Sequence, residues 1–478
     1  MRVLVVPEVY RADAGACGTL RDAATWVREW LDRDPTLHVY WLLPPREEAG
    51  YDRKDVLADR RRVTLLEART LGGVEDREVL TDCGYSTAQL AVLRDEIFAE
   101  GAYLDAVVDQ LRGGRFALYE WLLDHVEQWA ASVRPFDVIA NVHDLQVPFK
   151  YRYCSHRNDF QMVHELCAAT FADGRWFTAG VDRRQFRERA AEFLDSGAVE
   201  DALEDAVTTG SPIRVGRFEE SYAEEPRTLH LAGSLWDKKN ADRLLAVGER
   251  LHEEFGIETA LTSMEEIPER YRAPEWVRAF PNADRETYER ILREGDLTVC
   301  ASEYETMART WFEQAASGQV LVARDEPWVR ECVPDGYRLL ADVDGLADRA
   351  ARAVEDWAEA VAENRRLVEH VRETRSPGAV GDRTYADLRR RVDAKCDAYE
   401  SDAGPERAAV AAVLDGADGP LSLDALVERT AAFTDDGRPV TANSDVARTD
   451  VRYALRSLGY ADTGDPGTPA FASTEELW

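Results

Sequence analysis

The chain contains very little lysine. Among its 478 residues there are five lysines and 54 arginines, set against 91 aspartates and glutamates, and the net charge is −32. So much negative charge argues against binding nucleic acid or an anionic membrane by bulk attraction. Acidic surfaces with arginine in place of lysine are typical of proteins from salt-accumulating halophiles. We therefore expect a halophilic, archaeon-like source.

Evenly spaced cysteines and long apolar runs are also missing. The seven cysteines form no regular framework, so reduced thiols are expected. The first residues lack the apolar region of a signal peptide, and no run approaches membrane-spanning length. These absences predict a cytoplasmic protein without a transmembrane segment. A hydrophobic content of 45% supports folded cores, and the length suits two or three domains.

The first half of the chain alternates between strand-like and helix-like segments. Short, almost continuously apolar runs predict buried strands, and a helical stretch is predicted at about 86–133. This alternation indicates an α/β fold with a mostly parallel sheet covered on both faces. The predicted strands are residues 2–6, 36–43, 62–66 and 136–143.

A second strand–helix series begins near residue 226 and ends in a helical tail, 345–398. Two doubly wound, Rossmann-like domains would face a cleft and bind ligands outside the carboxyl ends of their strands. We predict domain boundaries at 1–220 and 221–400. The strands of the second domain are predicted at 228–233, 258–263, 277–280, 297–301, 319–323 and 338–340.

Residues 401–478 form a separate, mostly helical unit. Three predicted helices followed by a turn at 462–469 resemble a winged-helix domain. Arg448, Arg452 and Arg456 recur every four residues on the third helix, as in a helix that reads a DNA groove. The unit is nevertheless acidic, and a protein-interaction or oligomerisation module is an equal alternative. Nucleic acid is a possible partner only here, and DNA binding is not favoured.

Two of the five lysines, Lys238 and Lys239, stand side by side directly after the predicted strand 228–233. In a chain that avoids lysine, this pair indicates phosphate recognition. The alternative is a solvated helix start, although a cation is poorly placed at a helix amino terminus.

Glu305 and Glu313 follow the predicted strand 297–301, with seven residues between them. On one helix this spacing is slightly more than two turns, so both carboxylates would project from nearly the same face. Gly318 comes soon afterwards and can stop the helix. In a chain this acidic the pair alone is weak evidence, and the surrounding strand, Ser302 and the upstream lysines strengthen it.

Together, Gly233–Asn240 and the segment from the 297–301 strand to Gly318 resemble the carboxyl-terminal domain of the family-four (group 1) retaining glycosyltransferases. The resemblance covers 226–342 well and 2–220 weakly. It implies the two-domain GT-B fold and a metal-independent, hexosyltransferase-type enzyme. In this interpretation 1–220 is the acceptor-side domain and 221–400 the domain that binds a nucleotide-diphosphate sugar.

The resemblance also implies roles for individual donor-site residues. Lys239, assisted by Lys238, takes the place of the lysine that neutralises the departing diphosphate. Glu313 would accept the ribose hydroxyls, and Glu305 would lie near the donor sugar. Gly233, Ser302 and Ala308 complete the expected donor site.

On the acceptor side, His143 stands where a family histidine often faces the sugar. We count His143 with Glu305 and Lys239 as the catalytic candidates, and Gly15 and Gly18 as an acceptor-side loop. The acceptor itself, whether a glycan, a lipid-linked molecule or a small metabolite, is not specified by these residues.

Two positions depart from the family pattern. Ser234 replaces an arginine that contacts phosphate, and Lys238 is the candidate to compensate for it. Ala308 replaces a glycine that lets a backbone amide approach the donor. These departures favour a non-catalytic sugar-nucleotide sensor acting through residues 401–478. A further alternative is a GT-B sugar-nucleotide epimerase.

A metal site is the last candidate. Cys154, His156, His164 and Cys167 are four metal-competent side chains within 14 residues. Their spacing is not that of a standard zinc finger, so we predict no metal and no cofactor apart from the nucleotide-sugar co-substrate.

Overall fold

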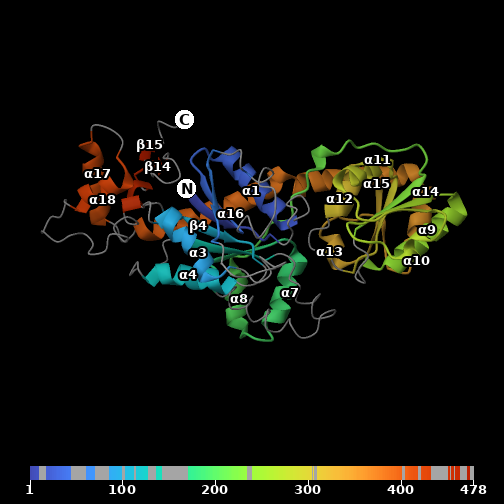
Figure 1. The fold of residues 1–478 in the computed structure, drawn as a ribbon, viewed down its shortest axis with the longest axis horizontal. Coiled ribbons are helices and arrows are strands. Elements are labelled where there is room, and N and C mark those ends of the chain that lie inside the picture. The colour runs from blue at the N-terminus through green and yellow to red at the C-terminus, as the bar shows by residue number, and fades with distance from the viewer. Residues whose placement is uncertain are drawn as a thin grey trace. The chain divides into compact units, whose positions relative to one another are not determined.

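In the computed structural model the chain forms two compact units (Figure 1). Unit 1 comprises Met1–Phe177, Gln185–Val207 and Gly381–Trp478, and unit 2 comprises Thr178–Arg184 and Thr208–Val380. The described residues are 1–9, 18–44, 57, 61–69, 85–98, 103–111, 115–127, 136–142, 171–233, 239–303, 305, 309–400, 404–417, 421–431, 451–452, 454–456, 458–462 and 471–473.

Unit 1 is built on a seven-stranded sheet with the order β3-β2-β1-β4-β5-β6-β7. Neighbouring strands from β1 to β6 pair in parallel, and β1, β2 and β4 consist of fully buried residues, as expected for strands covered on both faces. The strands are β1 (Arg2–Val6), β2 (His38–Leu43), β3 (Val63–Glu67), β4 (Ala106–Asp109), β5 (Asp137–Val142), β6 (Gly174–Phe177) and β7 (Val207–Thr208).

Helices α1 (Gly18–Arg33) and α16 (Pro377–Glu400) pack together with β6. Trp30 of α1 donates its indole N–H to Thr384 Oγ1 of α16 at 2.9 Å, and Trp176 of β6 donates to Asp387 Oδ2 at 2.7 Å. Trp26 meets Trp176 edge-on, with 5.7 Å between ring centroids. The helical tail predicted at 345–398 therefore ends against unit 1, where residues 381–400 make their contacts.

A second core in unit 1 involves α3 (Thr87–Leu93) and α4 (Arg115–Glu127), whose Leu90 and Leu118 pack with sheet residues such as Leu4. A capping box starts α3: Gln89 N donates to Ser86 Oγ at 3.3 Å, and Ser86 N donates to Gln89 Oε1 at 2.9 Å. Unit 1 also contains the π-helix Arg94–Phe98, α7 (Gly180–Ala190, which begins in unit 2) and α8 (Ser196–Glu204).

The prediction of one helical stretch over 86–133 is wrong. Between α3 and α4 the chain forms β4, which pairs with both β1 and β5 in the middle of the sheet. A short apolar run such as Ala106–Asp109 has no periodicity that separates a buried strand from a helix. Pairing with two neighbouring strands decides its conformation, and this pairing is not visible in the local sequence.

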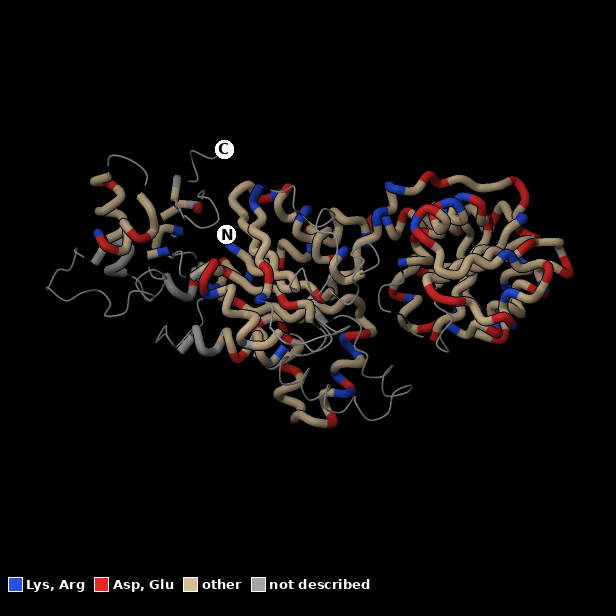
Figure 2. The backbone as a smooth tube through the Cα atoms, in the orientation of Figure 1, with Lys and Arg blue, Asp and Glu red and all other residues tan. Residues whose placement is uncertain are grey.

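Unit 2 contains a six-stranded parallel sheet with the order β10-β9-β8-β11-β12-β13, as the second strand–helix series predicts. In Figure 2 its charged residues lie around the outside, and the strands are mostly uncharged. The strands are β8 (Thr228–Ala232), β9 (Glu258–Thr262), β10 (Val277–Phe280), β11 (Leu297–Cys300), β12 (Val320–Arg324) and β13 (Leu340–Ala341).

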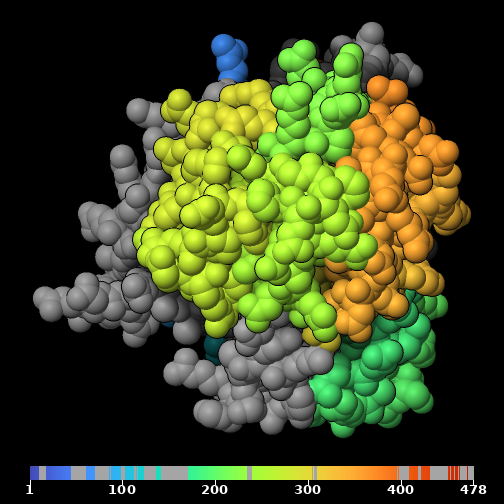
Figure 3. Space-filling view, turned by 90° about the vertical axis from the view of Figure 1, so that its right-hand side faces the viewer, coloured from blue at the N-terminus to red at the C-terminus, as the bar shows by residue number. Residues whose placement is uncertain are grey.

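The helices of unit 2 alternate with these strands. They are α9 (Ala241–Phe255), α10 (Glu269–Arg272), α11 (Arg285–Glu294), α12 (Arg309–Ala316), α13 (Pro327–Arg330), α14 (Leu346–Glu355) and α15 (Trp357–Arg375), with a short 3-10 turn at Val215–Arg217. Trp357 donates its indole N–H to Ala223 O at 2.9 Å, which ties α15 to the segment that enters the unit. In the space-filling view of Figure 3, the orange surface from the later part of this unit lies beside the lime-green surface from its earlier part.

Gly318 ends α12, as predicted. Its φ is +98°, and a Cβ built there would lie 1.9 Å from Ser221 O. Only glycine combines this left-handed backbone with so close a backbone neighbour.

The described part of 401–478 contains α17 (Gly404–Asp415), α18 (Leu423–Ala431), and the antiparallel pair β14 (Tyr460–Asp462) and β15 (Phe471–Ser473), with residues 451–452 and 454–456 helical. Its core includes Val410, Leu426 and Leu455, and also Tyr103, which precedes β4. We call this part the C-terminal module.

The arginine stripe predicted on this module faces protein where it is described. Arg452 is buried and donates to Leu104 O at 3.2 Å, and Arg456 pairs with Asp393 of α16 at 2.7 Å. Arg448 lies outside the described residues. A buried arginine cannot read a DNA groove, so Arg452 has a docking role within unit 1.

Candidate functional site

The predicted donor residues that the structure describes lie beyond the carboxyl ends of β8 and β11, neighbouring strands of unit 2. Gly233 follows β8 directly with a φ of +118°, and its N–H donates to Thr262 O at 3.0 Å. Ser302 follows β11 and is buried. The carboxyl edge of a parallel sheet is where doubly wound domains bind ligands.

Lys239 and Glu305 form an ion pair at this edge, between Nζ and Oε1. Both side chains are mostly buried, at 17% and 14% exposed. An ion pair screened from water is stronger than one on the surface. The structure thus brings together the predicted phosphate lysine and the first of the two predicted glutamates.

Asn240 helps to place Lys239. Its backbone is left-handed, with a φ of 52°, at the start of α9, and its side chain donates from Nδ2 to Ala301 O at 2.8 Å. This bond joins the segment after β8 to the segment after β11. Consequently Lys239 and Glu305, which are far apart in sequence, are held at neighbouring points.

Glu313 lies on α12 and faces a different cation. Arg285, the first residue of α11, places Nη1 3.6 Å from Glu313 Oε2 and donates from Nε to Glu289 Oε1 at 2.7 Å. The pKa of Arg285 is raised above its usual value: burial alone would lower it, and the charges of Glu313 and Glu289 outweigh that effect.

The expectation that Glu305 and Glu313 project from one helix is wrong, because α12 begins at Arg309 and Glu305 is not helical. The segment after β11 carries Glu305 toward Lys239 instead. The two carboxyl groups therefore lie on different elements, Glu305 in the segment after β11 and Glu313 on α12.

His143, Lys238, Ala308 and Gly15 lie outside the described residues, as do Ser234 and the four candidate zinc ligands. Gly18 is described and is the first residue of α1.

Among the described residues, no group of three or more His, Cys, Asp or Glu side chains is arranged to hold a metal ion. No described helix is both long and apolar enough to cross a membrane.

A buried polar network below the site had no signal in the sequence. His230 of β8 contacts Thr262 Oγ1 at 2.9 Å and Gln319 Nε2 at 3.1 Å, and Gln314 donates to His230 O at 2.9 Å. Burial lowers the pKa of His230 to about 3, so its ring is neutral at physiological pH. Burial also raises the pKa of the Cys300 thiol far above its usual range, which keeps a thiolate out of the site.

Unit 1 has its own buried polar cluster at the carboxyl ends of β4 and β5. Arg115 pairs with Asp109 at 2.9 Å and donates to Asn141 O at 2.9 Å, and Tyr119 donates to Asp109 Oδ2 at 2.8 Å. Burial raises the pKa of Asp109 in spite of Arg115. Sequence reasoning missed this cluster because it treated β4 and its surroundings as one helix.

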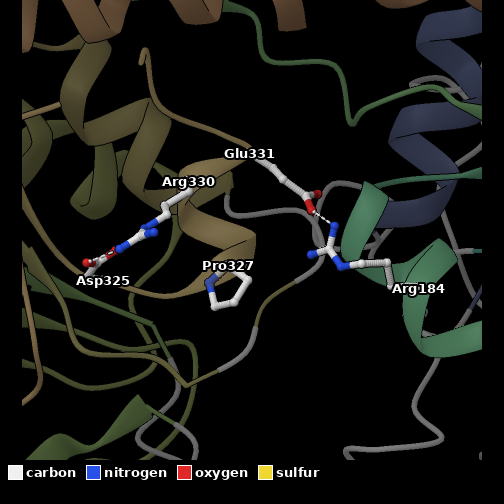
Figure 4. A pocket seen from close by; sticks show the side chains of 5 residues that line it. All are labelled: Arg184, Asp325, Pro327, Arg330 and Glu331. Carbon is white, nitrogen blue, oxygen red and sulfur yellow. Dashed lines mark hydrogen bonds and ion pairs between the residues drawn. The ribbon is translucent and has the colours of Figure 1, made fainter. Parts of the chain in front are cut away.

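A hollow of about 520 Å³ lies next to α13 and is lined by Arg184, Asp325, Pro327, Arg330 and Glu331 (Figure 4). Arg184 points toward Glu331 at 2.5 Å, and Arg330 turns toward Asp325, also at 2.5 Å. None of the predicted donor residues that the structure describes lines this hollow. Its charged side chains are paired with one another, so it does not replace the Lys239–Glu305 edge as the candidate site.

Comparison with known proteins identifies the fold. The structural neighbours are GT-B glycosyltransferases, so the chain has the GT-B fold of two parallel-sheet α/β domains that the sequence predicted. No protein-family model and no curated protein sequence matches the chain.

Three solved structures illustrate the likeness. Sucrose-phosphate synthase from Thermosynechococcus elongatus aligns over 83% of this chain and 100% of its own, with a TM-score of 0.60 and 16% identity. HepE from Anabaena, in complex with UDP, aligns over 81% and 99%, with a TM-score of 0.54 and 13% identity. A glycosyltransferase from Rickettsia africae aligns over 82% and 98%, with a TM-score of 0.55 and 12% identity.

Proposed function

We propose that the chain is a retaining, metal-independent glycosyltransferase that transfers a hexose from a nucleotide-diphosphate sugar to a hydroxyl acceptor. The observation that carries this proposal is the mostly buried Lys239–Glu305 pair at the carboxyl edge of β8 and β11, in a GT-B fold. A cation held at the ligand-binding edge of a sheet suits a diphosphate.

In the proposed reaction the bond between the anomeric carbon and the diphosphate oxygen breaks, and the acceptor oxygen bonds to the same carbon. The acceptor proton passes to the leaving diphosphate, so no side chain acts as a covalent nucleophile. The Lys239 ammonium stabilises the negative charge that develops on the diphosphate. Because lysine supplies this charge, the proposed reaction needs no metal ion.

The other predicted residues have supporting roles in this proposal. Glu313 accepts hydrogen bonds from the ribose hydroxyls, and Glu305 orients Lys239 beside the donor sugar. Gly233 and Ser302 shape the donor site, together with Lys238 and Ala308. The resemblance assigns His143 and the loop with Gly15 and Gly18 to the acceptor side. The Asp109–Arg115 cluster lies at a carboxyl edge of the sheet in unit 1.

The neighbours suggest which donors to test first. HepE has been solved with UDP and with UDP-glucose, and the E. coli trehalose-6-phosphate structure is bound with UDP-2-fluoro glucose. A UDP-sugar is therefore the first donor to test on this chain.

A non-catalytic sugar-nucleotide sensor is the second candidate. It is favoured by Ser234, which stands where the resembled family has a phosphate-binding arginine. In this alternative the C-terminal module, which packs on the rest of unit 1 through Tyr103, would transmit the bound state. A sensor would bind the nucleotide sugar without releasing nucleotide.

The test is a panel of UDP-, GDP- and ADP-sugars in molar potassium chloride, with binding and nucleotide release measured for wild type and Glu313→Ala. Glu289→Ala is a matched control, because Glu289 also pairs with Arg285. The transferase is supported if wild type binds a nucleotide sugar and slowly releases nucleotide, and if Glu313→Ala loses both activities while Glu289→Ala keeps them. Binding without release supports the sensor, and no binding to any donor refutes both.

A further inference from the structure

Two tryptophans form a stack beneath the Lys239 ammonium. Lys239 Nζ lies 4.7 Å from the ring centroid of Trp311 on α12. Trp311 in turn stacks on Trp328 of α13, with 5.4 Å between centroids and 30° between planes. The indole N–H of Trp328 donates to Glu303 O at 3.1 Å. One continuous series of contacts therefore runs from the ammonium to the segment that carries Glu305.

The stack is firmly held within unit 2. Trp311 and Trp328 are 6% and 3% exposed, and both belong to the core cluster of the unit. A lysine side chain on the surface samples many rotamers, and ordering it costs conformational entropy when a ligand binds. Resting on a rigid aromatic face, the Lys239 ammonium has a defined position before any ligand arrives.

The two partners of the ammonium differ in charge. Glu305 is the acidic partner of the ion pair, so it orients Lys239 but also offsets its attraction for phosphate. An indole ring attracts a cation through its quadrupole and carries no net charge. It can therefore fix the ammonium without neutralising it or repelling an incoming anion. The ammonium has three N–H donors, so an orientation set by Glu305 and Trp311 also sets the direction available to a diphosphate oxygen.

We propose that Trp311 is a positioning residue for diphosphate binding, acting through Lys239. This inference rests on the proposed function, because it deepens the role of the same site. Trp328 supports the Trp311 ring and, through Glu303 O, the segment leading to Glu305.

Simple core packing is the competing explanation for a buried tryptophan, and substitutions at one position separate the two. Trp311→Leu keeps an apolar side chain but removes the aromatic face. Trp311→Phe retains a smaller face with a weaker attraction for cations. Trp357→Leu is the matched control, because Trp357 is also a buried tryptophan of unit 2 but contacts Ala223 O.

The probes are UDP, GDP and ADP and, for the diphosphate that wild type binds, the matching nucleoside. Affinities are measured by calorimetry or competition in molar potassium chloride. Trp311→Leu should weaken diphosphate binding by about 3- to 10-fold, from the usual strength of a partly desolvated cation–π contact. Trp311→Phe should lie between Leu and wild type. Nucleoside binding should be unchanged in both variants, and Trp357→Leu should match wild type.

Equal diphosphate affinity in wild type and Trp311→Leu would overturn the proposal, as would an equal loss of diphosphate and nucleoside binding. If Trp311→Leu does not fold, Trp311→Met takes its place under the same criteria. Failure of wild type to bind any of the three diphosphates is a separate result, which refutes the proposed function itself.

Discussion

The contact between the C-terminal module and the rest of unit 1 gives a quantitative prediction about stability. Arg2 Nε of β1 lies 2.5 Å from Asp462 Oδ2 of β14, with side chains 0% and 1% exposed. Tyr103 also donates to Asp462 Oδ2, at 3.0 Å, and Arg2 donates to Tyr40 OH at 3.0 Å. Burial alone would lower the pKa of Arg2, and Asp462 outweighs it and raises the pKa above its usual value. Asp462→Ala removes this carboxylate from a buried guanidinium.

Removing one partner of a buried ion pair typically costs about 3–5 kcal/mol of the free energy of unfolding. The matched control is Glu200→Ala, because Glu200 pairs with Arg187 at 2.9 Å on an exposed surface, with side chains 61% and 47% exposed. Exposed pairs contribute about 0–1 kcal/mol. Denaturant titrations followed by circular dichroism in molar potassium chloride should separate the two variants clearly. Equal losses in Asp462→Ala and Glu200→Ala would refute the reasoning that this contact is buried and structural.

The remaining predictions concern unit 2. Gly318→Ala should lower the melting temperature and reduce the free energy of unfolding by about 1–3 kcal/mol or more. The reason is that an alanine is strained at a φ of +98° and its Cβ would meet Ser221 O. The control Gly216→Ala should be close to neutral, because a Cβ there would have open space around it. The folded pKa of His230 is about 3 and the unfolded value about 6.5, so the unfolded state binds the extra proton between these pH values. Stability should therefore fall as the pH drops below about 6.5, by at most about 1.4 kcal/mol per pH unit from this residue. Denaturation at pH 7 and at pH 5.5 gives the loss of unfolding free energy between these pH values. This loss should be smaller in His230→Asn than in wild type, and an equal loss would contradict a lowered pKa for His230.

The sequence predicted the strands of unit 2 well because their apolar runs are nearly continuous and are separated by turns. Glu258–Thr262 and Leu297–Cys300, for example, fall within the predicted ranges. The same rule failed in unit 1, where β4 lies between two helices and is only four residues long. Its identity as a strand depends on pairing with β1 and β5, which are distant in sequence.

The candidate site shows a similar division. Lys239 was predicted from the scarcity of lysine, and Glu305 from the motif spacing. In the structure these two residues form an ion pair. Their aromatic support could not be predicted, because Trp311 and Trp328 meet only when α12 and α13 pack together. The arginine periodicity in the C-terminal module gave the face of a helix but not what that face contacts, and Arg452 is buried against unit 1.

We propose that Lys239 holds a nucleotide diphosphate at the carboxyl edge of the unit 2 sheet. The most direct test compares nucleotide-diphosphate affinity in wild type, Lys239→Ala and the control Lys395→Ala, whose lysine pairs with Asp137 in unit 1. A charge-assisted contact predicts a loss of about tenfold or more in Lys239→Ala, with Lys395→Ala close to wild type. Wild-type affinity in Lys239→Ala would contradict the account.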